Sequence, residues 1–282
     1  MTGAGYAVRT MSRRELDRAV DWAAAEGWNP GLHDAGAFHV ADPEGFLVGV
    51  LDDRPVASIS VVRYGQGFGF LGFYIVVPEA RGHGYGRQIW EAGLARLAGC
   101  VVGLDGVVAQ QENYRRSGFA LAWRNIRFGG VPPVEDWPTD GLVDARTIPM
   151  DRLLAFDGTL FPAPRPSFLA AWIALPGAVA LARLRDGDLV GFGVVRPCRE
   201  GMKIGPLYAA DPGVARQLFL ALAAAARGEP VFLDVPEPNR DAVALAREAG
   251  LTQHFETARM YAGPAPALDA RRLYGITTFE LG

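Results

Sequence analysis

Apolar and polar residues follow two different periods along this chain, one typical of helices and one typical of strands. Ser12 and Glu15 have the spacing of a capping box, and apolar residues recur behind them at helical intervals as far as Gly27. Short apolar runs bounded by glycine, proline and aspartate come next, and these predict strands joined by turns. The chain is therefore expected to open with a helix and continue into a sheet.

Across the first half, strands and helices are predicted in a definite order. A hairpin is expected from strands 46–51 and 56–63, because the turn Asp52–Pro55 lies between them. The remaining predicted elements are a strand at 68–77, a helix at 87–98, a strand at 101–108, a short helix at 111–117 and a strand at 120–128. This mixture places the chain in the α/β class.

A segment dense in glycine and proline, residues 129–141, separates this half from the next. We therefore predict two domains, 1–130 and 145–282, joined by a linker at 131–144. The second half contains helices and strands in a similar order. Its predicted helices are 150–157, 166–174, 214–227 and 240–249, and its predicted strands are 179–184, 189–196, 202–209 and 231–235.

A weak internal duplication supports this division. Each half places a Leu-Asp pair near the end of its late strand, Leu104-Asp105 and Leu233-Asp234. Each then ends the following helix with a glycine and an apolar residue, Gly118-Phe119 or Gly250-Leu251. Features that recur in one order indicate two related domains.

The stretch Arg81-Gly82-His83-Gly84-Tyr85-Gly86-Arg87, between a predicted strand and a predicted helix, carries the clearest chemical signal. Glycines there let the backbone turn sharply, and free amides at a helix start attract an anion. A nucleoside-triphosphate loop would need Gly-Lys-Ser/Thr, which is absent, and the G-x-G-x-G spacing is a poor dinucleotide fingerprint. A phosphate or pyrophosphate site of another kind is expected.

Residues 81–86 resemble the Arg/Gln-x-x-Gly-x-Gly/Ala loop of the GNAT acyltransferase superfamily, which holds the pyrophosphate of acyl-coenzyme A. The later Tyr114–Phe119 is similar to the family's Tyr-x-x-x-Gly-Phe signature. The resemblance covers about the first 130 residues. It implies two GNAT-like domains, each with a mixed, mostly antiparallel central sheet flanked by helices, and acetyl-CoA as the cofactor.

The resemblance also implies roles for individual residues. Cofactor-binding residues would be Arg81, Gly82, His83, Gly84, Tyr85, Gly86 and Arg87 around the pyrophosphate, and the main chain of Ile75, Val76 and Val77 along the pantetheine arm. Amides directed at the thioester carbonyl would stabilise its developing negative charge. Tyr114 would protonate the departing thiolate. Val107 and Gln110 stand where the family often has Asn and Ala.

The base that accepts the amine proton is not evident, because the strand 68–77 contains no acidic residue. Asp105, at the end of the neighbouring strand, is the leading candidate, with Asp34, His33 and Glu280 behind it. For the acceptor site we expect walls from Trp28, Asn29 and Trp123. The acceptor itself stays open between a small amine, an amino-acid derivative, an aminoglycoside-like molecule and a protein lysine.

The second half has lost the glycine loop, since residues 210–216 read Ala-Asp-Pro-Gly-Val-Ala-Arg. Asn239 and Ala242 match family positions that the first half lacks, but Ala246 stands in the tyrosine position. We interpret this half as a degenerate GNAT-like domain. Residues 274–281 have strand character and resemble the tail of tandem GNAT proteins.

Composition and charge limit the kinds of partner that the protein is expected to bind. The 282 residues carry 28 basic and 31 acidic side chains, a net charge of -3, without a basic stripe, so nucleic acid is not expected. Cys100 and Cys198 lie far apart without metal-type spacing, so neither a disulfide framework nor a metal site is expected. No signal peptide and no apolar stretch long enough for a bilayer are evident, which predicts a cytoplasmic protein without a membrane partner.

The sequence therefore predicts an acetyl-CoA-dependent N-acetyltransferase with direct transfer to a primary amine. Two alternatives stay open: a non-catalytic acyl-CoA-binding or regulatory module, and an acetyltransferase like mycothiol synthase, in which the second domain is the working one. A homodimer also stays open.

Overall fold

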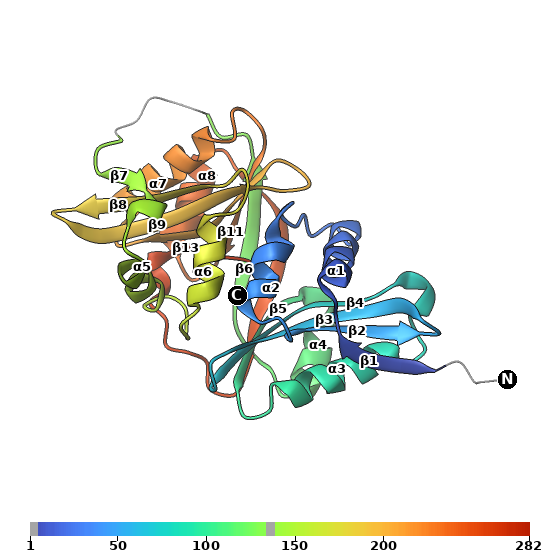
Figure 1. The fold of residues 1–282 in the computed structure, drawn as a ribbon. Helices are drawn as coiled ribbons and strands as arrows, with labels where there is room; N and C mark the ends of the chain where they lie inside the picture. Colours follow the sequence, from blue (N-terminus) through green and yellow to red (C-terminus); the bar gives the residue numbers. More distant parts are fainter. Residues whose placement is uncertain (1–4, 134–138) are drawn as a thin grey trace.

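The computed structural model describes residues 5–133 and 139–282, in which thirteen strands form one continuous sheet with helices on both faces (Figure 1). Residues 134–138 of the predicted linker lie outside the described part. No helix of the described residues is long and apolar enough to cross a membrane.

The elements of the first half follow the predicted order, with additions. They are β1 (Tyr6–Thr10), α1 (Arg13–Ala25), α2 (Asp34–Ala41), β2 (Phe46–Leu51), β3 (Arg54–Tyr64), β4 (Phe68–Val76), α3 (Tyr85–Arg96), β5 (Val101–Val107), α4 (Gln111–Arg116) and β6 (Ala120–Gly130). Ser12 and Glu15 form the predicted capping box at the start of α1.

The second half repeats the plan. Its elements are β7 (Leu142–Asp144), α5 (Met150–Asp157), α6 (Pro166–Ile173), β8 (Val179–Arg185), β9 (Asp188–Pro197), β10 (Met202–Ala209), α7 (Pro212–Ala224), β11 (Val231–Pro236), α8 (Arg240–Glu248), β12 (Thr252–Ala262) and β13 (Leu273–Gly275). β7 falls within the range predicted as linker and pairs with β8.

The two halves share one core on one face of the sheet. Alternate residues of β2 point to opposite faces: Phe46 and Val48 pack with α1 and α2, whereas Leu47 packs on the side of α3. The first of these clusters continues without a break into α5, α6 and the residues Phe192 and Tyr208 of the second half. The halves are therefore joined by buried apolar surface.

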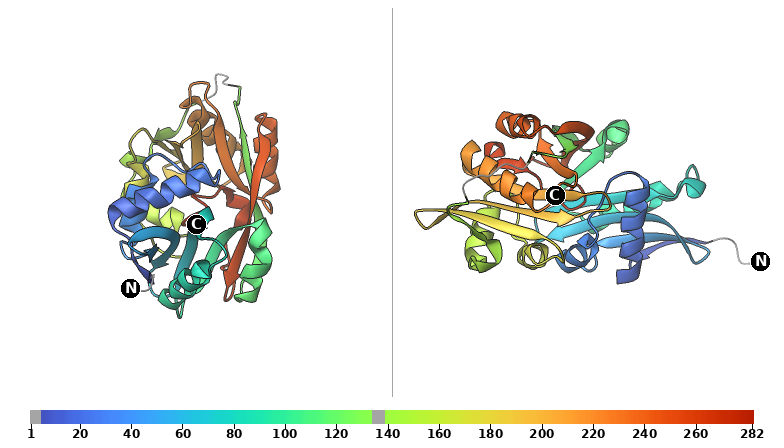
Figure 2. Two further views of the ribbon diagram at one scale, coloured as in Figure 1. Left: turned by 90° about the vertical axis from the view of Figure 1, so that its right-hand side faces the viewer. Right: turned by 90° about the horizontal axis from the view of Figure 1, so that it is seen from above.

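The last long strand of each half is exchanged between the halves. β12 lies between β5 and β6, and β6 lies between β12 and β11, so the central strand order is β5-β12-β6-β11. Figures 1 and 2 show β6, in green, beside β12, in red, across the middle of the molecule. Each half thus completes its sheet with a strand from the other.

Two buried ion pairs accompany this exchange. Arg259 on β12 donates from Nε and Nη2 to the Asp105 carboxylate on β5, at 2.7 and 2.6 Å. Arg127 on β6 donates in the same bidentate way to Asp234 on β11, at 2.6 and 2.7 Å. All four side chains are at least nine-tenths buried. The duplicated Leu-Asp pairs of the sequence are therefore the acidic halves of two reciprocal bridges.

Each half contains a place where two parallel strands separate. β4 and β5 pair only from Phe68 to Leu71 and from Val101 to Leu104. A register shift in the β3–β4 pairing follows, near Phe73, whose φ of 45° is unusual for a bulky residue. The two strands diverge beyond this bulge and leave a gap in the sheet. In the second half β10 and β11 pair only as far as Ile204 and Leu233 before they separate.

We predict that Arg127→Met lowers the free energy of unfolding by about 3–5 kcal/mol, because it leaves the Asp234 carboxylate buried without its partner. Urea denaturation of the whole chain provides the measurement. Arg216→Met, which removes an exposed pair with Glu248, is the control and should cost at most about 1 kcal/mol. Equal losses in the two variants would contradict the importance of the buried Arg127–Asp234 pair.

Candidate active site

The glycine loop lies between β4 and α3, as predicted. Gly82 and Gly84 have φ values of 80° and 83°, a region that residues with a side chain rarely adopt. Gly84 is the N-cap of α3 and supplies no side-chain hydrogen bond, so the first amides of the helix are not capped by a side chain. A Cβ at Gly82 or Gly84 would meet no atom within 4 Å, which leaves the space in front of these amides open. This geometry fits an anion such as a pyrophosphate.

Three side chains of the loop have partners within the protein. Arg81 donates from Nε to the carbonyl of Val76 at 2.8 Å and forms an ion pair with Glu26. His83 lies with its Nδ1 2.8 Å from the carbonyl of Arg81. Arg87 pairs with Glu91 at the surface, where both side chains are exposed. Arg87 is therefore placed to move toward a bound anion at little cost.

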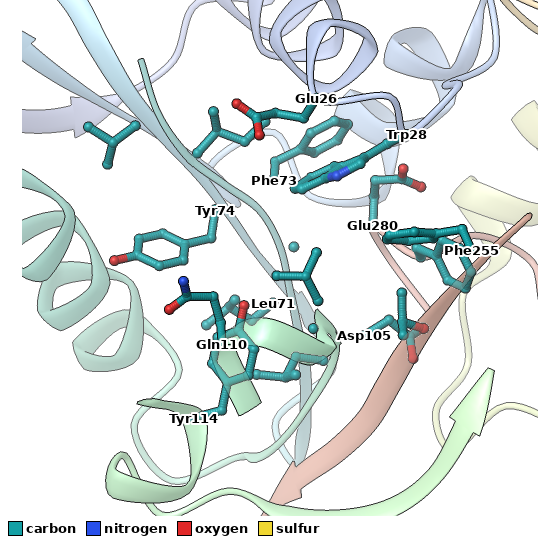
Figure 3. Close-up of a pocket in the computed structure, with 18 of the residues that line it drawn as sticks. Glu26, Trp28, Leu71, Phe73, Tyr74, Asp105, Gln110, Tyr114, Phe255 and Glu280 are labelled. Carbon is teal, nitrogen blue, oxygen red and sulfur yellow. The ribbon is translucent and has the colours of Figure 1, made fainter. Parts of the chain in front are cut away.

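Two cavities meet beneath this loop. The larger, about 380 Å³, occupies the gap between β4 and β5, and the smaller, about 270 Å³, lies between α3 and α4. Tyr74, Gln110 and Tyr114 line both. The larger one is shown in Figure 3. A long ligand could therefore pass along the smaller cavity and present one end to the larger.

Tyr114 stands at this junction. Its ring stacks on Trp90 with centroids 5.6 Å apart, and Gly106 provides the space, since a Cβ there would lie 2.1 Å from the Tyr114 ring. Burial, together with the nearby Tyr74, raises the pKa of Tyr114, so the hydroxyl keeps its proton. Among the described residues none forms a hydrogen bond with that hydroxyl. The group is thus free to donate to a ligand.

Of the three residues expected along the pantetheine arm, two line the larger cavity and one does not. Ile75 and Val76 line the larger cavity. Val77 does not, and its amide donates to the carbonyl of Val56 on the neighbouring strand. Val107 and Gln110, which replace the family's usual residues, also line the cavity.

Asp105 lines the larger cavity, but its carboxylate is already engaged. Burial raises its pKa, while Arg259 and Asn125 oppose that rise by donating three hydrogen bonds to its two oxygens. A carboxylate held in this way would have to break a buried bridge in order to receive a proton. Its position supports a role in strand exchange more directly than a role as base.

The two other candidates near the start of the chain lie outside the cavity lining. Asp34 is buried and accepts from Arg196 at 2.7 and 3.1 Å. It also accepts from the amide of Gly31 at 2.9 Å. His33 precedes α2 as its N-cap residue without a side-chain capping bond. Neither faces Tyr114 across the cavity.

Glu280, by contrast, is brought into the larger cavity by the tail segment, residues 276–282. It is 4% exposed, and its Oε1 has no hydrogen-bond partner. Figure 3 shows it beside Trp28 and Phe255, across the cavity from Tyr74 and Tyr114. From the sequence, Glu280 is a weaker candidate than Asp105, because nothing in a linear pattern shows that residue 280 returns to the first half.

Of the three residues expected to form the acceptor site, only one lines the larger cavity. Trp28 lines the cavity. Asn29 does not: its side chain exchanges two 2.9 Å hydrogen bonds with the main chain of Glu200. Trp123 packs near Tyr261 and Arg259 and donates to Asn125, also outside the lining.

Several cavity residues were not found from the sequence. Phe255 and Thr257 come from β12, and Phe279 comes from the tail segment. All three residues belong to the second half of the chain. The strand exchange places β12 beside β5 of the first half. A usable signal existed, since Arg127 and Arg259 follow Gly118 and Gly250 by the same interval and mark equivalent strands.

The equivalent gap in the second half is occupied by the chain itself. β13 pairs with β10 at Leu207 and Tyr208, where β10 has left β11. The Asn239 amide donates to the carbonyls of Arg271 and Leu273, so this family-like asparagine binds the protein's own strand. The gap that is open in the first half is therefore filled in the second.

The phosphate end of that second cleft is closed as well. The start of α7 has Pro212 in its first turn, and Asp211 caps the helix by accepting from the amide of Val214 at 2.9 Å. An aspartate at this position takes up a free amide and would repel a phosphate. Of the two halves, the first has the open loop.

The described residues contain no group of three or more His, Cys, Asp or Glu side chains that could hold a metal ion. Cys100 and Cys198 are free thiols.

Comparison with known proteins gives matches in both halves. The description "Acetyltransferase (GNAT) family" matches residues 10–119, and "Acetyltransferase (GNAT) domain" matches residues 153–275. A holothin acyltransferase from Pseudoalteromonas sp. (strain SANK 73390) is 33% identical over 264 residues, which cover 93% of this chain and 90% of that protein.

Solved structures share the whole architecture. A putative acetyltransferase from Pyrococcus horikoshii superposes with a TM-score of 0.84 at 22% identity, over 100% of this chain and 98% of that one. A tandem GNAT protein from the clavulanic acid biosynthesis pathway gives a TM-score of 0.63 at 15% identity, over 93% and 100% of the two chains. At these identities the likeness concerns the fold alone. Together with the matches of both halves and the 33% identical acyltransferase, it leads to one conclusion: this chain belongs to the GNAT acetyltransferases and carries two GNAT domains.

Proposed function

We propose that the first half transfers an acetyl group from acetyl-CoA directly to an amine, with both substrates bound at once. One observation carries this proposal: Tyr114 lines both the smaller cavity, which contacts α3 beyond the glycine loop, and the larger cavity beneath it. The open cradle of Gly82 and Gly84 and the uncapped start of α3 fit a pyrophosphate. The relative from Pseudoalteromonas, named as an acyltransferase, supports the reaction class.

Acetyl-CoA supplies a thioester whose carbonyl carbon forms a bond to the amine nitrogen as its C–S bond breaks. The protein's residues hold and move the protons. Tyr114 donates its proton to the leaving sulfur, and the nitrogen loses one proton to a base. Main-chain groups of β4 beyond the Phe73 bulge lie along the gap and can bind the arm and polarise the carbonyl. Both partners bound in one gap bring the reacting atoms together without a covalent enzyme intermediate.

The walls of the larger cavity favour a compact amine with a flat, apolar frame. Six aromatic side chains line it: Trp28, Phe73, Tyr74, Tyr114, Phe255 and Phe279. Of its carboxylates, Glu26 pairs with Arg81 and Asp105 pairs with Arg259, which leaves Glu280 without an ion-pair partner among the described residues. A polyamine or aminoglycoside carries several positive charges and would need more than one free carboxylate.

We predict release of free CoA from acetyl-CoA that depends on an added amine, fastest with small aromatic amines and slow with spermidine, an aminoglycoside or a lysine peptide. A thiol-reactive dye records the release, and mass spectrometry identifies the acetylated amine. Binding of acetyl-CoA without turnover of any amine would instead establish a non-catalytic cofactor-binding protein.

Tyr114→Phe should lower kcat by about 10²-fold or more while leaving the Kd for acetyl-CoA within about twofold, because it removes the proton donor and keeps the ring. Steady-state kinetics and isothermal titration give the two numbers. Tyr74→Phe is the matched control, since Tyr74 lines the same two cavities. A large loss in Tyr74→Phe alone would transfer the acid role to Tyr74.

We predict that one acetyl-CoA binds per chain, since β13 fills the second cleft. We also predict that Gly84→Leu weakens this binding. Gly99→Leu is a close control, because Gly99 has a φ of 84° and equally open surroundings at the other end of α3. Both substitutions cost about 1–2 kcal/mol in backbone strain, but Gly84→Leu alone should weaken cofactor binding at least tenfold. Titration showing two sites, or equal affinities of the two variants, would contradict this prediction.

A further inference from the structure

The tail segment, residues 276–282, is fixed against the strands of the first half. The carbonyl of Glu280 accepts from Ser60 Oγ on β3, and the carbonyl of Leu281 accepts from the Tyr64 hydroxyl. Gly72 on β4 permits the close approach, because a Cβ there would lie 2.3 Å from the Glu280 carbonyl oxygen. The main chain at residue 280 is therefore held at the bulge where β4 leaves β5.

A local turn also holds the main chain at Glu280. Thr278 Oγ1 accepts hydrogen bonds from the amides of Glu280 and Leu281, both at 3.0 Å. With its main chain held from both sides, Glu280 lines the larger cavity, and its side chain lies beside Trp28 and Phe255 (Figure 3). The position does not depend on a flexible loop.

The Glu280 carboxylate does not serve as a partner for the buried cations near it. Arg127 is paired with Asp234, and Arg196 is paired with Asp34. Lys203 donates to the carbonyl of Asn29 at 2.6 Å. In the described part of the chain no cation lies within 4.0 Å of the Glu280 oxygens, and Oε1 makes no hydrogen bond. A buried carboxylate oxygen without a partner costs free energy, so its presence requires a reason other than packing.

A second residue that lines the same cavity, Thr257 on β12, also has a buried polar atom without a partner, its Oγ1. Two unsatisfied polar atoms in one aromatic cavity indicate a ligand that hydrogen-bonds to them. An amine nitrogen can donate to Glu280, and another polar atom of the same molecule can reach Thr257.

We propose that Glu280 is the general base of the reaction, supplied to the first half's active site by the tail segment of the second half. This proposal rests on the function proposed above. As the amine nitrogen bonds to the thioester carbon, Glu280 accepts one proton from that nitrogen. Tyr114, on the other side of the cavity, gives its proton to the leaving sulfur, so that charge balances across the site. Once the products leave, Glu280 releases its proton to solvent and Tyr114 takes one up from solvent, which restores both groups.

The charges around Glu280 suit this role. Burial raises the pKa of its carboxyl, against the opposing effect of Lys203 on β10. Asp34 on α2 adds to the rise. Arg127 on β6 and Arg196 on β9 act in the lowering direction. A carboxylate with a raised pKa is a stronger base than an exposed glutamate. The Glu280 carboxylate is charged and can accept a proton above its pKa in the folded protein. When the pH falls through that value, the group becomes protonated and can no longer act as a base.

The test compares Glu280→Gln with Asp105→Asn and with Glu229→Gln, an exposed control with the same chemical change. Glu280→Gln should lower kcat by about 10²–10⁴-fold, bind acetyl-CoA as before, and lose the acidic limb of the pH profile of kcat/KM. Asp105→Asn should be destabilised yet keep that limb, and Glu229→Gln should match the wild type. Urea denaturation verifies the fold of each.

Glu280→Asp makes the test independent of folding problems in the glutamine variant. It keeps a titrating carboxylate at a shorter reach, so we expect a reduced kcat with the acidic limb still present. A folded Glu280→Gln with an unchanged rate and profile would overturn the proposal, as would loss of the limb in Asp105→Asn alone. Absence of amine-dependent thiol release from the wild type would refute the proposed function itself.

Discussion

The reciprocal bridges Arg259–Asp105 and Arg127–Asp234 are the contacts on which the rest of the molecule depends. Each joins a strand of one half to a strand of the other, and each is buried. Such pairs add little net stability compared with apolar residues, but an unpaired member is severely penalised. We infer that they specify which strand lies beside which. The exchange then carries Phe255 and Thr257 into the first half's cavity, and the segment after β12 brings Glu280 there.

The two halves have used the same gap in opposite ways. In the first, an uncapped α3 and an open loop leave the gap between β4 and β5 free for a ligand. In the second, Asp211 caps α7 and β13 fills the gap. Closure of the second gap and completion of the first are thus coupled, because the chain that fills the second gap continues directly into the residues that line the first.

Much of the fold was predictable from local patterns, since the capping box of α1 and the apolar runs of β2 to β5 determine their own structure. The glycine loop and Tyr114 could also be picked out as candidate site residues, because each lies in a short local motif. β12 escaped prediction: its sequence from Thr252 to Thr257 is mostly polar, and its position is set by pairing on both sides. Glu280 could be named only as a weaker candidate than Asp105, because its place depends on contacts with Ser60 and Gly72, more than 200 residues away in the chain.

The strand exchange has a consequence for synthesis on the ribosome. Residues 1–130 contain the open glycine loop, yet the edge of β5 stays unpaired until residues 252–262 have emerged. A nascent first half would therefore wait with an open sheet edge, a state that invites aggregation and that chaperones recognise. The first half can complete its sheet only after residues 252–262 have been translated, so the two halves expressed separately would be poor substitutes for the joined chain.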